Sequence, residues 1–237
     1  MGRSGRVISA VPSGSQHGMI NTAYSLGKEN YPWWPDWKDE CVAILASGGS
    51  AKKVGIEKLR DRIHVVTIKQ TVELCKDWAE AVYGCDDPWW VAREGLPEFK
   101  GLKFSYGPVA TTRFKNIHRV TIASGDDLMI EQPLVVGNGG NSGFQMLNLV
   151  AQFGVKGIIL VGFDMNNVGG IHWYGRNTFN GMNNPAESNY QRWIQGFEAI
   201  KKKVKALDID VVNVSPTSSL NAFRKSTIED ALKDWGL

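Results

Sequence analysis

A helix pattern that runs directly into a buried strand, in residues 141–164, limits the possible folds of this chain more than any other feature. Residues 142–153 carry apolar side chains at spacings of three and four, which predicts a helix with one buried face. Gly154 then provides a C-cap, and the run "GIILVGFD" (157–164) predicts a strand that is covered on both sides. A helix and strand in this order are typical of parallel sheets with helices on both faces.

The alternation of strands and helices continues along most of the chain. Apolar positions recur at three and four over residues 190–207, and the run "DVVNV" (210–214) follows. Short β-branched or apolar runs predict further strands at 42–47, 64–68, 102–106 and 118–124. A polar segment able to form a helix follows each of the first two runs. We therefore expect one α/β domain with a Rossmann-like, doubly wound and mostly parallel sheet.

Residues 1–38 differ from the rest and are expected to form an irregular arm that precedes the Rossmann-like domain, residues 39–237. The stretch "YPWWPDW" cannot be a regular helix, because proline removes a backbone donor and forces an extended neighbour. Its side chains Trp33, Trp34 and Trp37 are expected to pack either on the domain or on a partner subunit. A homo-oligomer held together by the arm is therefore one of the two alternatives.

Charge and cysteine content exclude several classes of protein. Lys and Arg number 27 against 24 Asp and Glu, and this excess of +3 is too small to indicate nucleic-acid binding by itself. The odd number of cysteines, Cys41, Cys75 and Cys85, has no zinc spacing and indicates reduced thiols in the cytoplasm. No apolar stretch approaches the length of a membrane span, so no membrane association is expected.

The first candidate binding loop is "SGGS", directly after the strand predicted at 42–47. Ligands of open α/β sheets bind at the carboxyl ends of the strands. There Ser47, Gly48, Gly49 and Ser50 can present backbone N–H groups to an anion, since glycine permits close approach. An ordinary tight turn explains the same residues, so this loop alone is a weak signal.

The second candidate loop is "GNGGNSGF" (137–144), which leads into the helix predicted at 142–153. Asn141 or Ser142 can act as the N-cap, and the glycines leave the first amides, including that of Gly143, able to bind phosphate. Two such loops in one doubly wound domain favour a ligand that carries phosphate.

A long polar segment after the strand 157–164 has the length of a lid over a site. Asp164 begins it, and this carboxylate can hold a ribose hydroxyl, a metal ion or a loop amide. His172 follows two glycines and can act as acid, base or phosphate donor near neutral pH. A loop histidine that only bonds to the backbone is the structural alternative.

An acidic turn, "YGCDDPWW" (83–90), follows another strand end. Asp86 can bind a ligand hydroxyl or cap the helix that starts near Pro88. Trp89 and Trp90 are expected to belong to the core.

The order of these segments resembles the sialyltransferase-like and MptE-like (DUF115) superfamily, and most closely its uncharacterised phage and prophage members. The resemblance spans roughly Trp37 to Leu232. The segments that carry it are "VAILASGGSA", "YGCDDPWW", "NSGFQMLNLVAQFGVKGIILVGFDM", "HWYG" and "DVVNVSPTSSLNAF". The resemblance implies a nucleotide-binding domain whose relatives transfer a sugar from a CMP-activated donor, or pyrophosphate from ATP to a pterin alcohol. It places Ser47, Gly48, Ser50, Ser142 and Gly143 around the donor.

The chain departs from the pattern of this superfamily at three places. Gly49 stands where proline is usual, and Lys69 and Gln70 follow the second strand, where many members have an asparagine that helps to hold the nucleotide. In the lid, Arg176 and Asn177 fill the stretch in which members often carry a second histidine.

From these observations we expect a cytoplasmic transferase that binds a nucleotide-activated donor, most plainly a glycosyltransferase that uses a nucleotide sugar. His172 or Asp164 would be the catalytic base, Arg176 or Lys69 would neutralise developing charge, and no metal is required. One alternative is an ATP-dependent pyrophosphokinase with Mg²⁺ on Asp86 and Asp164. Another is a phage protein that binds a nucleotide without catalysis. The acceptor is open, and a modified DNA base is a weaker idea.

Overall fold

The centre of the sheet consists of two parallel strands, β1 (Cys41–Leu45) and β8 (Gly157–Val161), which pair along their whole length. Side chains of β1 alternate between two hydrophobic clusters: Val42 and Ile44 belong to one, and Ala43 belongs to the other. All residues of both strands are buried. Helices therefore cover both faces, which explains why these two segments are apolar without interruption.

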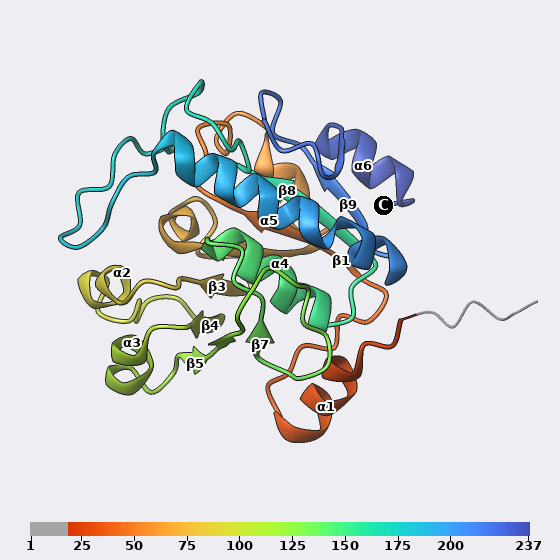
Figure 1. Ribbon diagram of the computed structural model, residues 1–237, viewed down its shortest axis with the longest axis horizontal. Coiled ribbons are helices and arrows are strands. Elements are labelled where there is room, and N and C mark those ends of the chain that lie inside the picture. Colours follow the sequence, from red (N-terminus) through yellow and green to blue (C-terminus); the bar gives the residue numbers. More distant parts are fainter. Residues whose placement is uncertain (1–18) are drawn as a thin grey trace, which may run out of the picture.

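The computed structural model describes residues 19–237, and within them eight strands form one parallel sheet (Figure 1). In sheet order the strands are β10 (Arg224–Lys225), β9 (Asp210–Asn213), β8, β1, β2 (His64–Ile68), β3 (Ala81–Tyr83), β4 (Leu102–Ser105) and β5 (His118–Arg119). A separate pair is formed by β6 (Thr121–Ile122) and β7 (Val135–Val136). The predicted Rossmann-like α/β fold is confirmed.

Two long helices, α4 (Ser142–Gln152) and α5 (Glu187–Ala206), lie side by side over one face of the sheet (Figure 1). The other face is covered by shorter elements: η1 (Ile56–Leu59), α2 (Asp87–Ala92), α3 (Pro108–Arg113) and α6 (Ile228–Asp234). The polar segments after β1 and β2 form only short 3₁₀ helices, η1 and η2 (Lys69–Leu74). The predicted strand at 118–124 is divided into β5 and β6.

The described part of the N-terminal arm is attached to the domain by its tryptophans. Trp34 and Trp37 are buried and meet Phe153 of the core edge-on, at ring-centroid distances of 5.0 and 5.3 Å. The expectation of an irregular arm was wrong for α1 (Thr22–Asn30), whose first turn is capped by the side chain of Asn21. Residues 31–37 have no regular helix, as expected. Residues 1–18 lie outside the described residues, and the oligomer stays a prediction.

Among residues 19–237, no helix combines the length and the apolar character that a membrane crossing needs.

Candidate functional site

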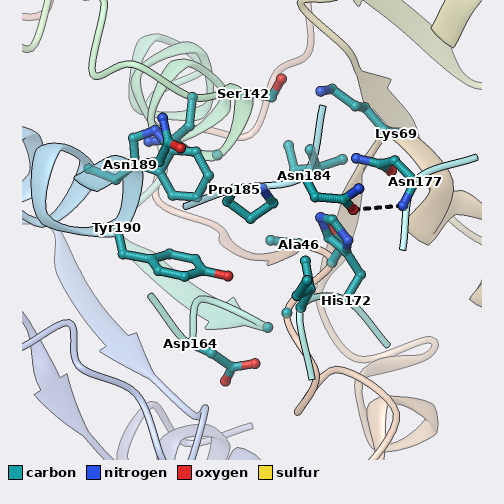
Figure 2. A pocket seen from close by; sticks show the side chains of 18 of the residues that line it. Ala46, Lys69, Ser142, Asp164, His172, Asn177, Asn184, Pro185, Asn189 and Tyr190 are labelled. Atoms are coloured by element: carbon teal, nitrogen blue, oxygen red, sulfur yellow. Dashed lines mark hydrogen bonds between the residues drawn. The ribbon is translucent and has the colours of Figure 1, made fainter. Parts of the chain in front are cut away.

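A cavity of about 330 Å³ lies at the carboxyl ends of β1, β2, β3 and β8, beneath the lid segment and against the starts of α4 and α5 (Figure 2). This is the position at which open parallel sheets bind ligands. The cavity brings together most of the predicted site residues: Ser47, Gly48, Lys69, Asp86, Asn141, Ser142, Gly143, Asp164 and His172. Gly49, Ser50 and Arg176 do not line it, and Arg176 is exposed to solvent.

Two amides of the first glycine loop donate to the protein itself. The amide of Gly48 donates to the carbonyl of Gly162 at 3.0 Å, and that of Ser50 donates to Oδ2 of Asp164 at 2.9 Å. A Cβ on Gly48 would lie 2.3 Å from Asp164 Oδ2, and one on Gly49 would lie 2.2 Å from the carbonyl oxygen of Gly169. The glycines therefore admit other parts of the chain, and the predicted phosphate cradle has lost two of its amides.

Asp164 is positioned by that loop and still has one oxygen to offer. It follows β8, its side chain is 3% exposed, and Ser50 holds its Oδ2. Its Oδ1 has no hydrogen-bond partner among the described residues, although Asp164 lines the cavity. A buried carboxylate oxygen without a partner is costly, so a ligand donor at this atom would lower the free energy of the site.

The second glycine loop leaves the start of α4 open. Of the two predicted N-cap candidates, Asn141 is the N-cap: its Oδ1 accepts the amide of Phe144 at 2.9 Å, and its Nδ2 donates to the carbonyl of Gly139 at 3.0 Å. The amides of Ser142 and Gly143 are at the first helical positions, where no carbonyl of the helix can accept from them, and no other acceptor in the described chain reaches them. Both residues line the cavity.

A further ion pair fixes this second loop from behind. Arg192 of α5 contacts both carboxylate oxygens of Asp126, at 2.6 and 2.7 Å, and Asp126 in turn accepts the amide of Gly139 at 2.9 Å. The guanidinium of Arg192 holds the pKa of Asp126 below its usual value. Because Gly139 precedes the N-cap, this network holds the helix start in place before any ligand arrives.

Lys69 and Asp86 form an ion pair on the side of the cavity formed by β2 and β3. Asp86 occupies the N-cap position of α2 but makes no capping hydrogen bond, so of the two roles proposed for it from the sequence, capping was wrong. Burial acts to lower the pKa of Lys69, but neighbouring acidic groups, Cys85 and Asp86, raise it above the usual value. Lys69 therefore remains a cation whose charge Asp86 compensates.

His172 enters the cavity from the lid. Its Nδ1 lies 3.1 Å from the carbonyl of Gly175, and its ring stacks on Tyr174 with an interplanar angle of 2°. A carbonyl only accepts, so Nδ1 carries the proton and Nε2 keeps a lone pair. Burial, and then the charge of Lys69, hold the pKa of His172 below its usual value despite the bond to Gly175. The ring is thus neutral near pH 7, as a general base must be.

The lid is attached to the first glycine loop. The amide of Trp173 donates to the carbonyl of Ser47 at 3.0 Å, and Gly169 lies against Gly49. The ring of Trp173 is also covered by the ammonium of Lys52, 4.1 Å from the ring centroid. The first loop therefore helps to position the lid segment that carries His172.

Part of the cavity wall is aromatic and was not found from the sequence. Phe163, Tyr190 and Trp193 line the cavity, together with the apolar side chains of Met165 and Pro185. Figure 2 shows Tyr190 extending from α5 into the cavity, with Asp164 beyond it. The Tyr190 hydroxyl has no hydrogen-bond partner among the described residues, and burial raises its pKa. The spacing of Tyr190 and Trp193 fits a buried helix face equally well, so periodicity alone could not distinguish the two roles.

Within residues 19–237, no group of three or more His, Cys, Asp and Glu side chains is arranged to hold a metal ion. The predicted Mg²⁺ ligands of the pyrophosphokinase alternative, Asp86 and Asp164, are already engaged by Lys69 and by the amide of Ser50.

Comparison with known proteins identifies the fold. No protein-family model matches the chain, and no curated protein matches it in sequence. Among solved structures, the sialyltransferase CstII from Campylobacter jejuni with the substrate analogue CMP-3FNeuAc aligns with a TM-score of 0.52 at 14% identity, over 79% of this chain and 86% of that chain. Its complex with cytidine-5'-monophosphate aligns with a TM-score of 0.52 at 15% identity, over 80% and 86%.

The domain therefore has a sialyltransferase-like variant of the Rossmann-like α/β fold. The narrower expectation of a DUF115 or phage protein stays a prediction.

Proposed function

We propose that this protein is a glycosyltransferase that takes a sugar from a nucleotide-activated donor. The observation that carries the proposal is that an open helix start, at Ser142 and Gly143, and a neutral histidine, His172, face the same cavity. An anion-binding helix start suits the phosphate of the donor. A neutral imidazole suits removal of a proton from the acceptor.

The nucleoside would occupy the aromatic end of the cavity. Tyr190 and Trp193 offer ring surfaces to a base, and Oδ1 of Asp164 can accept a hydrogen bond from a ribose hydroxyl. The raised pKa of Tyr190 keeps its hydroxyl protonated and able to donate. This arrangement supplies partners for two buried polar atoms that otherwise have none.

The phosphate next to the transferred sugar would rest on the amides of Ser142 and Gly143. The α4 dipole adds positive potential at that point. When the bond between the anomeric carbon and the phosphate oxygen breaks, the negative charge that develops on the leaving phosphate meets donors that are already in place.

His172 would complete the transfer. An acceptor hydroxyl attacks the anomeric carbon and gives its proton to Nε2 of His172, while the electron pair of the breaking bond leaves with the nucleotide phosphate. The Nδ1 bond to Gly175 fixes the ring in the tautomer that this step needs. Arg176 lies outside the cavity and is given no part in the step.

Calorimetric titration of the protein with CMP, CDP, UDP, GDP and ADP, with and without Mg²⁺, tests the first half of the proposal. We expect saturable binding of at least one nucleotide without a requirement for Mg²⁺, and release of that nucleotide from its sugar conjugate when a hydroxyl acceptor is present. Strict dependence on Mg²⁺ with ATP turnover would favour the pyrophosphokinase alternative. Binding without turnover would favour a non-catalytic nucleotide-binding protein.

A further inference from the structure

The Lys69–Asp86 ion pair is a built feature of the cavity wall and not a mobile surface contact. The Lys69 and Asp86 side chains are 21% and 39% exposed. Lys69 has a positive φ of 46°, which is rare outside glycine and costs about 1 kcal/mol or more. Gly84 leaves room for its stem, since a Cβ there would lie 3.3 Å from Cγ of Lys69.

Asp86 also does not cap α2, although it occupies the N-cap position. An aspartate at an N-cap ordinarily accepts a hydrogen bond from the first turn of its helix, but Asp86 makes no such bond and contacts Lys69. Strained backbone and a forgone cap at the same two residues are typical of a functional site.

The pair lies at the end of the cavity where the chemistry would occur. The charge of Lys69 contributes to the lowered pKa of His172. Figure 2 shows Lys69 and His172 on one side of the cavity, and Tyr190 on the other. If the nucleoside occupies the Tyr190 end, the transferred sugar lies next to His172 and therefore next to Lys69 and Asp86.

The charges of the cavity decide which sugar fits this end. Among the cavity-lining residues that the structure describes, the Lys, Arg, Asp and Glu side chains are Lys69, Asp86 and Asp164. Asp86 compensates the one cation, so a carboxylate on the sugar would be desolvated beside Asp86 without a counter-charge. Hydroxyl groups, in contrast, can donate to the carboxylate of Asp86 and accept from the ammonium of Lys69.

We propose that the Lys69–Asp86 pair makes this a transferase for uncharged sugars and excludes sugars that carry a carboxylate. The inference rests on the proposed function. It assigns the pair to the transferred sugar and not to the nucleotide.

The test uses donors that share a nucleotide and differ in one group. UDP-glucose and UDP-glucuronate, and GDP-mannose and GDP-mannuronate, differ in whether the sugar ends in a hydroxymethyl group or a carboxylate. For the wild-type protein we expect the uncharged sugar nucleotide to bind about tenfold more tightly than its acidic partner. A sugar hydroxyl can donate a hydrogen bond to the Asp86 carboxylate, whereas a sugar carboxylate cannot and is repelled by it.

Asp86→Asn should abolish this preference. Asparagine keeps the shape and is as good an N-cap as aspartate, but it leaves the ammonium of Lys69 without a counter-charge. Affinity for the acidic sugar nucleotide should therefore rise about tenfold relative to the uncharged one, while affinity for the bare nucleotide changes little. Lys69→Asn should make the acidic sugar bind less tightly still, and asparagine tolerates the positive φ of this position.

The matched control is Asp36→Asn. Asp36 also pairs with a lysine, Lys28, on the exposed arm away from the cavity, so the same change in net charge occurs there without touching the site. This variant should keep the wild-type preference.

The outcomes separate the inference from the proposed function. If no nucleotide in the panel binds, the proposed function fails and the inference fails with it. If a nucleotide binds but acidic and uncharged sugars bind equally, or Asp86→Asn leaves their ratio unchanged, the inference alone is overturned. It is also overturned if Asp86→Asn changes the affinity for the bare nucleotide as much as that for its sugar conjugate.

Discussion

The two glycine-rich loops of this domain have similar composition but make different contacts. In the first loop, the amides of Gly48 and Ser50 donate hydrogen bonds to Gly162 and Asp164, and the absence of side chains on the glycines leaves room for neighbouring parts of the chain. In the second, the amides of Ser142 and Gly143 keep no partner in the described chain and open onto the cavity. Glycine predicts close approach of another group, but it does not say whether that group is a ligand or the protein.

This difference in amide contacts suggests a different function for each loop. The first loop holds the Asp164 carboxylate and the lid, through the bond between Trp173 and Ser47. In the proposed function, the second loop provides the anion site at the start of α4. Substitutions in the first loop should therefore affect folding and lid position, whereas substitutions in the second should affect the affinity for phosphate.

The largest effect is expected for His172, the lid residue that contacts with the first loop help to position. His172→Ala should lower the rate of sugar transfer by about 10²- to 10⁴-fold, because the acceptor proton loses its base. Nucleotide affinity should change less than threefold, since the phosphate rests on α4. Steady-state rates and calorimetry on one preparation measure both. A variant that turns over at the wild-type rate would remove His172 from the mechanism.

Gly48→Ala should lower the free energy of unfolding by about 1–3 kcal/mol, because the added methyl group overlaps the Asp164 carboxylate. Gly169→Ala is the control: its Cβ would meet nothing closer than 3.7 Å, and its cost should stay within about 0.5 kcal/mol. Urea denaturation of both variants provides the values. If Gly48→Ala were neutral in stability but lost nucleotide binding, the first loop would be the phosphate site after all.

Asn141→Ala should cost about 1 kcal/mol of stability through loss of the α4 cap, and it should also weaken nucleotide binding several-fold as the first amides lose their order. Asn21→Ala removes the equivalent cap from α1, away from the cavity. That control should lose stability without losing affinity. Equal binding by the two variants would contradict the role given to the second loop.

The smallest effect is a displacement of the pH profile. A buried histidine with a lowered pKa stays neutral at pH values where an ordinary one is protonated. The midpoint of the loss of turnover at acid pH should therefore lie below about 6.5, the unperturbed value. A midpoint above that value would mean that the titrating group is not His172.

The sequence predicted the fold well because the signals for it are local. The apolar face of residues 142–153 and the run 157–164 determine α4 and β8 without reference to the rest of the chain. The N-cap role of Asn141 is local too. The helix α1 was missed because the arm was judged by the proline-rich stretch that follows it, although Asn21 provides a cap.

The sequence predicted most of the candidate residues that line the cavity, but not their contacts. Asp164 and Ser50 are 114 positions apart, and nothing near either residue indicates that one holds the other. The Lys69–Asp86 pair likewise joins the ends of two strands that only the sheet brings together. Residues of α5 such as Tyr190 were recognised only as part of a periodic apolar face, because a cavity wall and a core face share the same spacing.

The most direct test of the account is to observe the backbone amides of both loops while a nucleotide binds. Amide-resolved NMR of uniformly nitrogen-labelled protein, titrated with the tightest-binding member of the nucleotide panel, follows each loop separately. The account predicts large shifts for Ser142 and Gly143, and small shifts for Gly48 and Ser50, whose hydrogen bonds to the protein persist. Large shifts at Gly48 and Ser50 with none at the start of α4, or no response to any nucleotide, would contradict it.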